Sequence, residues 1–438
     1  MFDLYWIRIS KFLLFWLIPL SVFACTKTSK DLPEKPTEIA PEVELESSII
    51  GKILCGYQGW FNAEGDGADL GWKHYKNDGK FEPGTCSVDF WPDMREYGSD
   101  EKFETVFKLA DGSPAYVFSS ASSKTVDRHF QWMKDYGIDG VFIQRFVSNV
   151  GNAKLHNNMT KVFDNCYIAS EKHDRLISVM YDLSGSKREV VENAKTDWKL
   201  LVDRYGINDP HKKNVLTLKG KPVVAIWGVG FKDREYTLED IQKLINFFKN
   251  DPVYGNCSVL LGVPTGWRTL DRDCINDPKV LELIKSADIV HPWTPGRYNS
   301  LTGADEHKAT YTINDKKWCD QNDLTYMPVV FPGFSWYNLK KGEAPFNAIP
   351  RLKGDFLWRQ FYNAISAGAE TIYVAMFDEM DEGTCIFKCA NNPPVGDSPF
   401  NTYEGLPSDY YLWLTGKATQ MLRNEIPLSS SKPEYPNN

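Results

Sequence analysis

Short apolar segments alternate along the chain with longer stretches in which apolar residues recur at intervals of three and four positions. The short segments are rich in β-branched and aromatic residues and have the length of buried strands. The longer stretches have the period of amphipathic helices; Val190, Ala194 and Leu201, for example, share one face. We predict eight strands, over residues 52–57, 140–144, 176–181, 222–227, 257–263, 288–292, 326–331 and 371–377.

Helical periodicity is clearest in five of the remaining stretches, residues 126–133, 159–169, 190–202, 241–248 and 352–365. Alternating strands and helices predict parallel strands, because each helical crossover returns the chain to the same end of the sheet. Eight such units most simply close into a (β/α)8 TIM barrel, a single α/β domain with long loops after its first and eighth strands. The alternative is an open, doubly wound sheet, but no glycine-rich phosphate loop follows any predicted strand.

The N-terminus has the pattern of a processing signal. Arg8 and Lys11 precede the apolar run 12–23, which is shorter than the roughly 20 residues needed to span a bilayer. The run ends at Ala24 and Cys25, which resembles a bacterial lipoprotein signal in which Cys25 is lipidated. An ordinary secretory signal and an uncleaved anchor are the alternatives.

This signal predicts three segments and a location. Residues 1–25 are the signal, and residues 26–48, rich in Pro, Glu, Lys and Thr, form a disordered tether. Residues 49–438 are the barrel domain. We expect the protein in the bacterial envelope, held at the cell surface or the periplasmic face of the outer membrane by the lipid anchor alone.

Composition narrows the possible partners. The net charge is -8 and the chain has no basic blocks, which argues against nucleic acid as a partner. The 14 Trp, 21 Tyr and 25 Phe offer platforms for sugar rings. Eight cysteines remain besides Cys25; Cys385 and Cys389 are the best candidates for a disulfide, although several others are as consistent with buried thiols. No Cys or His spacing indicates a metal, and we expect no cofactor.

Polar and aromatic residues follow nearly every predicted strand. In such barrels the chemistry takes place at the carboxyl ends of the strands, so these residues predict a polar cleft with aromatic walls. The long connections 58–125 and 378–408 have the length of functional walls or lids. The residues that we expect to line the cleft are Tyr57, Trp60, Gln144, Arg145, Asp182, Trp227, Trp293, Trp336 and Tyr337.

The strongest chemical signal is residues 378–384, with the sequence DEMDEGT, directly behind the last predicted strand. Four carboxylates so close to a core repel one another and cost stability, which points to proton transfer or to a bound cation. Glu379 and Glu382 become neighbours, with Cβ atoms roughly 5–6 Å apart, if the chain turns there. Carboxyl groups about 5 Å apart suit retaining glycoside hydrolysis. Asp182 or Asp378 is an alternative partner of Glu382, and a solvated loop or a metal site is the alternative for the whole cluster.

Four segments carry a resemblance to a known family: residues 55–61 (CGYQGWF), 126–146, 180–185 (MYDLSG) and 379–384 (EMDEGT). They resemble glycoside hydrolase family 71/99-like proteins over nearly the whole of the predicted domain. The pattern at Glu379 and Glu382 is more distantly similar to that of the family 99 endo-α-mannosidases and endo-α-mannanases. Met380 and Asp381 differ from the residues usual between the two glutamates in that family.

The resemblance implies roles for the two glutamates. Glu379 would act as base on the 2-hydroxyl of the sugar, giving an anhydro-sugar intermediate and net retention. Glu382 would be the general acid and base at the glycosidic oxygen. We therefore expect a monomeric, endo-acting glycosidase for α-linked glycans of the α-mannan type or a related polysaccharide. The competing class is a non-catalytic glycan-binding lipoprotein with the same barrel cleft.

Overall fold

Eight parallel strand segments close into a barrel in the computed structural model, which describes residues 47–436. The hydrogen-bonded order is β10-β9-β8-β7-β5-β4-β1-β12-β11, and every pairing along it is parallel. The strands are β1 (Lys52–Tyr57), β4 (Gly140–Phe146), β5 (Leu176–Asp182), β7 (Lys221–Trp227), β8 (Ser258–Pro264), β9 (Ile289–Trp293), β10 (Thr325–Tyr326), β11 (Val329–Val330) and β12 (Thr371–Val374).

The barrel closes through the predicted strand 326–331, which appears as two short pieces. β10 pairs with β9, while β11 pairs with β12, so this one segment joins the two ends of the sheet. Pro328 lies between the pieces and has no backbone N–H to donate, which explains the break. The (β/α)8 prediction is confirmed.

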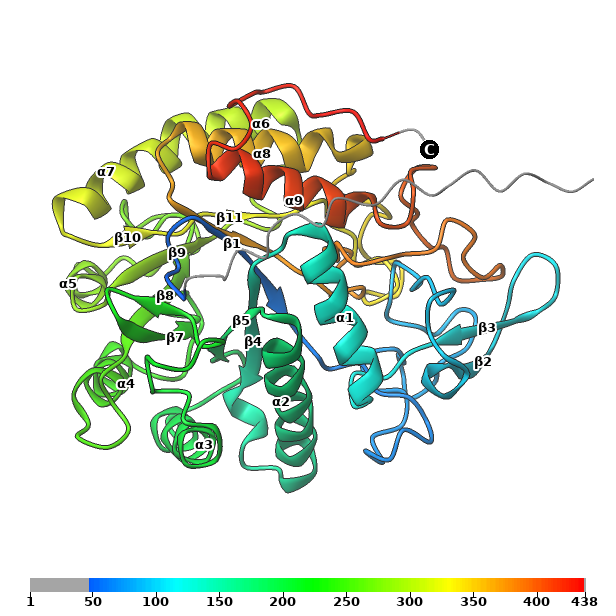
Figure 1. Ribbon diagram of the computed structural model, residues 1–438, viewed down its shortest axis with the longest axis horizontal. Helices are drawn as coiled ribbons and strands as arrows, with labels where there is room; N and C mark the ends of the chain where they lie inside the picture. The colour runs from blue at the N-terminus through cyan, green and yellow to red at the C-terminus, as the bar shows by residue number, and fades with distance from the viewer. Residues whose placement is uncertain (1–46, 437–438) are drawn as a thin grey trace, which may run out of the picture. The chain divides into compact units, whose positions relative to one another are not determined.

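Helices surround the strands (Figure 1). All five predicted helices are present, and their faces that pack on the sheet carry the apolar residues of the sequence pattern. The short helices α5 to α7 and the C-terminal α9 were not predicted. The helices are α1 (Ser123–Tyr136), α2 (Ala153–His173), α3 (Val190–Tyr205), α4 (Leu238–Asn250), α5 (Lys279–Lys285), α6 (Leu301–His307), α7 (Ile313–Gln321), α8 (Asp355–Ser366) and α9 (Tyr410–Leu422).

The long connection after β1 carries structure of its own. It contains the antiparallel hairpin of β2 (Phe103–Lys108) and β3 (Pro114–Val117), which leads into α1. Ser122 caps the first turn of α1 by accepting a hydrogen bond from the backbone N–H of Thr125. The other short elements are η1 (Ser99–Glu101), η2 (Val147–Asn149), β6 (Thr217–Leu218), the π-helical turn η3 (Lys308–Thr312) and η4 (Leu352–Gly354).

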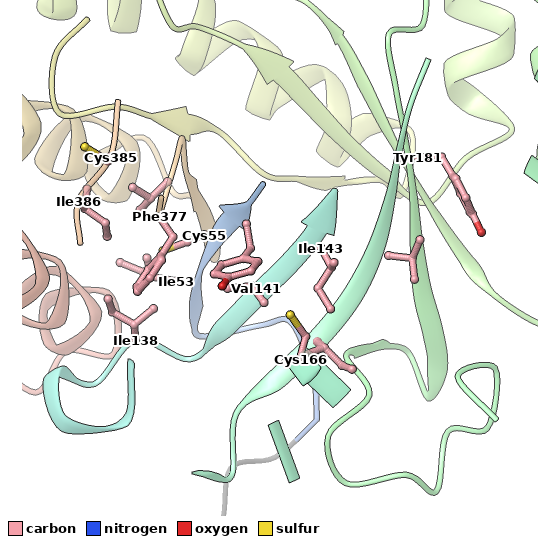
Figure 2. Close-up of a cluster of buried hydrophobic side chains, with 14 of the residues drawn as sticks. Ile53, Cys55, Ile138, Val141, Ile143, Cys166, Tyr181, Phe377, Cys385 and Ile386 are labelled. Atoms are coloured by element: carbon pink, nitrogen blue, oxygen red, sulfur yellow. The ribbon is translucent and has the colours of Figure 1, made fainter. Parts of the chain in front are cut away.

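The core has two layers, because successive residues of a strand point to opposite faces of the sheet. Ile53 and Cys55 of β1 belong to the cluster between the sheet and the helices, whereas Leu54 belongs to the cluster inside the barrel. Figure 2 shows part of the outer cluster, where Ile53, Cys55 and Val141 gather with Cys166 of α2. This alternation decides which residues near the strand ends can face the cleft.

The predicted signal 1–25 with Cys25, and the predicted tether as far as residue 46, lie outside the described residues. At Ser47, the first described residue, the backbone oxygen accepts a hydrogen bond from the backbone N–H of Thr217 at 2.7 Å. Within residues 47–436 no helix is both long and apolar enough to cross a membrane. All eight cysteines there are thiols; the sulfur atoms of Cys385 and Cys389 lie 3.6 Å apart and are not bonded, so the predicted disulfide is absent.

Candidate active site

A cavity of about 200 Å³ lies at the carboxyl ends of the strands. Its wall comes from six strand ends and from the acidic segment after β12. Seven of the predicted site residues meet there: Trp60, Gln144, Asp182, Trp227, Trp293, Glu379 and Glu382. The other lining residues are Gln58, Phe146, Met180, Ser184 and Met376.

The acidic segment makes the turn that the sequence suggested, over residues 380–383. Gly383 has a φ of 64°, and a Cβ atom there would lie 2.9 Å from both the backbone N and O of Ser335. Glycine is therefore required, because the close neighbour is backbone and cannot move aside. The N–H of Ser335 donates to the backbone oxygen of Glu382 at 2.9 Å, and Arg351 donates to the oxygen of Gly383 at 2.8 Å. The turn is thus held from both sides.

Glu379 has a donor on each carboxyl oxygen. The side-chain amide of Gln58 donates to Oε1 and the hydroxyl of Thr384 donates to Oε2, both at 2.7 Å. Burial and repulsion from Glu382 and Asp381 raise the pKa of Glu379 well above its usual range, while these two hydrogen bonds act in the opposite direction. Donors on both oxygens fix the orientation of the carboxyl group and favour its ionised form.

Glu382 is placed differently, because its carboxyl group makes no hydrogen bond or ion pair with any described side chain and faces the cavity. Burial and the neighbouring Asp381 raise the pKa of Glu382 to about 7, and the ammonium of Lys340 acts against this rise. A carboxyl group with such a pKa keeps its proton near neutral pH and can donate it.

The two aspartates proposed as alternative partners differ in access. Asp378 accepts the backbone N–H of Gln58 at 2.8 Å and that of Gly59 at 2.9 Å, one on each oxygen. It ties the acidic segment to the end of β1 and does not line the cavity. Asp182 does line the cavity and accepts the N–H of Ser184 at 2.7 Å. Asp378 therefore acts as a clamp, and Asp182 is the aspartate that a ligand can reach.

Asp381 lies between the glutamates in the sequence and is buried. Its Oδ2 is 3.1 Å from Nδ1 of His74, and burial raises its pKa to about 7. The ring of His74 stacks on that of Trp60, with centroids 3.9 Å apart and an angle of 4° between the planes. Trp60 also stacks with Phe146, at 5.3 Å. The wall of the cavity at Trp60 is thus packed against a histidine that contacts the acidic segment.

On the far wall Trp227 and Trp293 meet edge to face, with centroids 5.3 Å apart. Gln144 points inward, where its side-chain amide donates to the hydroxyl of Tyr373 at 2.9 Å. Aromatic walls with few polar groups suit the apolar faces and hydroxyl groups of sugar rings.

Two predicted lining residues face the helices instead, and the sequence pattern could have shown it. Tyr57 is fully buried with Ile53 and Cys55 on the outer face of β1, where its hydroxyl bonds His129 at 2.9 Å. Arg145 neighbours the inward-pointing Gln144 and so points outward. It is fully buried and binds Asp197. The prediction that Tyr57 and Arg145 line the cleft is wrong.

Trp336 and Tyr337 also lie outside the cavity lining. The ring of Trp336 packs against Phe334 at 5.0 Å and beneath the ammonium of Lys340. Tyr337 packs edge-on against Phe346, and its backbone N–H donates to Asp89. The buried Asp89 carboxylate holds their loop, because it accepts hydrogen bonds from three of its residues, Ser335, Tyr337 and Asn338.

A second cavity, of about 210 Å³, adjoins the first and shares Gln58, Trp60, Gln144 and Phe146 with it. Its base is apolar, with Ile143 of β4 and Val162 of α2. The remaining lining residues are Gly59, Lys73, His74, Ser148, Asn149, Leu155, Asn158 and Met159. Neither cavity has ligands for a metal: within residues 47–436 no three His, Cys, Asp or Glu side chains are grouped to hold one.

No protein-family model and no curated protein sequence matches this chain. Among solved structures, it is similar to the GH99 endo-alpha-mannosidase from Bacteroides thetaiotaomicron, with a TM-score of 0.63 at 14% identity, over 85% of this chain and 98% of that one. The structure of that mannosidase with bis-tris propane gives a TM-score of 0.61 at 14% identity, over 86% and 98%. At this identity the likeness shows that the two chains share the barrel fold.

Proposed function

We propose that this protein is a retaining, endo-acting glycosidase for α-linked glycans of the α-mannan type, with Glu379 as base and Glu382 as general acid and base. The observation that carries the proposal is a pair of glutamates, one buried and one partly exposed to the cavity, between aromatic walls at the carboxyl ends of the strands. The shared fold with an endo-α-mannosidase supports the same class of substrate. The sugar and the linkage are proposed from that likeness and from the family resemblance of the sequence.

The surroundings of the two glutamates support a division of roles. The charges of Glu379 and Glu382 repel each other, so one of the two carboxyl groups holds a proton near neutral pH. Donors on both oxygens of Glu379 favour the ionised form there and leave the proton on Glu382, as suits a base and an acid respectively. Glu382 has no partner among the described side chains and a pKa of about 7, as suits a group that gives a proton to a leaving oxygen.

The family resemblance supplies the route. Glu379 removes the proton of the sugar 2-hydroxyl, whose oxygen attacks the anomeric carbon while the glycosidic bond breaks and Glu382 protonates the departing oxygen. Water, deprotonated by Glu382, then attacks the anomeric carbon, and Glu379 returns its proton to the 2-oxygen as the anhydro ring opens. Two inversions give net retention.

Product release from α-mannans, α-glucans and mixed plant and host glycans tests the proposal, with wild type, Glu379→Gln and Glu382→Gln compared. Glu104→Gln, an exposed glutamate of β2, is the matched control. We expect a defined oligosaccharide from α-mannan with wild type and the control, and a loss of about 10²–10⁴-fold in both cavity variants. Glycan binding without turnover in all four proteins would instead establish a glycan-binding protein.

A further inference from the structure

His74 is held in an unusual backbone conformation beside the cavity. It lies in the connection between β1 and β2, far in sequence from the acidic segment, and has a φ of 61°. Positive φ is uncommon for residues other than glycine and costs free energy, so it persists where the surroundings enforce it. The hydroxyl of Ser87 binds the backbone oxygen of His74. Such strain often accompanies a functional position.

The strained backbone lets one side chain make two contacts of different kinds. Nδ1 of His74 lies 3.1 Å from Oδ2 of Asp381, and the flat ring stacks on Trp60 with only 4° between the planes. The other oxygen of Asp381 is buried and has no hydrogen-bond partner among the described residues. His74 is therefore the one side chain of residues 47–436 that hydrogen-bonds this carboxyl group.

The charges around this contact determine the effect of losing it. Three other carboxyl groups of the acidic segment, those of Asp378, Glu379 and Glu382, interact electrostatically with Asp381. The ammonium of Lys73, next to His74 in the sequence, also acts on Asp381. Lys340 and Asp182 further act on Glu382. Burial and Lys73 hold the pKa of His74 well below its usual range, so its ring is neutral at pH 7 and has one N–H to donate. In the tautomer that carries its hydrogen on Nδ1, the ring donates to Asp381 and favours the ionised form of that carboxyl group, whose charge raises the pKa of Glu382.

We propose that His74 is a positioning residue, which holds the Asp381 carboxylate beside Glu382 through Nδ1 and fixes the Trp60 wall of the cavity through its ring. The inference rests on the proposed glycosidase activity for its kinetic consequences, but not for its structural ones. In this role His74, which does not lie at a strand end, influences both the protonation of Glu382 and the position of the Trp60 ring in the cavity wall.

Two substitutions of His74 separate the two contacts. His74→Phe keeps a flat ring against Trp60 and removes the hydrogen bond. His74→Asn keeps a short donor, removes the ring and suits a positive φ. Asp381→Asn removes the charge itself, and Glu104→Gln, on the exposed face of β2, is the control.

The pH profile of kcat/KM and the value of KM are measured for each variant. In His74→Phe and Asp381→Asn we expect the basic limb to move to lower pH by about one unit, because Glu382 loses a neighbouring negative charge. In His74→Asn we expect the basic limb to stay in place while KM rises about three- to tenfold, because the wall at Trp60 loses its stacked partner. Profiles unchanged in both His74→Phe and Asp381→Asn would overturn the inference.

A second readout does not depend on turnover. The titration midpoint of Glu382, followed by NMR with carboxyl-labelled glutamate in the absence of substrate, should fall in His74→Phe and Asp381→Asn relative to wild type. An unchanged midpoint in correctly folded protein overturns the inference, even if no glycan is cleaved. Absence of turnover by wild type together with a shifted midpoint would reject the proposed activity and leave the role of His74 intact.

Discussion

At the scale of the residue, Gln144 and Arg145 show that a shift of one position along a strand moves a side chain from the cavity to the outer face of the sheet. Gln144 points into the barrel and lines the cavity, while Arg145 points outward and is fully buried between β4 and the helices. Its Nε donates to Asp197 at 2.6 Å, and Asp197 also bonds His156 and Tyr181. Burial alone would raise the pKa of Asp197, but the guanidinium of Arg145 outweighs burial and holds that pKa below its ordinary value. Arg145 thus belongs to a buried polar network that anchors α2 and α3.

We predict that Asp197→Asn destabilises the protein by about 3–5 kcal/mol, because it leaves the buried guanidinium without its counter-charge. Chemical denaturation with wild type as reference measures the free energy of unfolding. Asp305→Asn, which removes the half-exposed partner of Arg359, is the control and should cost less than about 1 kcal/mol. Equal losses in the two variants would contradict the structural role assigned to Asp197.

At the scale of the element, the end of β12 determines the site. The predicted strand 371–377 ends its ladder at Val374, after which the chain passes into the turn that carries both glutamates. Neighbouring loops hold this turn through Ser335, Arg351 and the two amides bound by Asp378. The position of the carboxyl groups therefore depends on backbone contacts between elements rather than on the acidic segment alone.

Gly383→Ala tests these contacts. The new Cβ would meet the backbone of Ser335 at 2.9 Å, so the turn must shift and both glutamates with it. We expect glycan turnover to fall by about 10²-fold or more, since small displacements of catalytic groups have effects of that size. Gly405→Ala is the matched control, because Gly405 also has a positive φ, of 82°, but nothing within 4 Å of its Cβ position. Comparable losses of activity in the two variants would show that backbone strain, not the contact with Ser335, is responsible.

At the scale of the whole molecule, the site lowers the stability of the fold at alkaline pH. The pKa values of Asp378, Asp381 and Glu382 are each raised to about 7, with burial as the main cause. Between the unfolded value of about 4 and the folded value of about 7, the native state binds more protons than the unfolded one. The free energy of unfolding contributed by these groups is therefore largest at acidic pH and is lost as the pH rises through this range.

We predict that Glu382→Gln stabilises the protein at pH 8 and changes its stability little at pH 4.5. The difference is up to about 3 kcal/mol, from a shift of roughly two and a half pKa units. Denaturation curves for wild type and variant at both pH values measure it, and Glu104→Gln is the exposed control. A gain that is the same at both pH values would show that the charge of Glu382 is not the cause.

The sequence by itself determined the strands, the principal helices and the acidic turn, because these depend on local periodicity and on residues adjacent in the chain. It could also have separated Gln144 from Arg145, and Tyr57 from the cleft, since the alternation of a strand is a local property. The tertiary structure alone decided the rest. Barrel closure brings His74 against Asp381, 307 positions away in the sequence. The contacts of Asp89 with Ser335 and Tyr337 hold the loop that keeps Trp336 out of the cavity lining. Contacts between segments so far apart have no local sequence pattern from which they could be predicted.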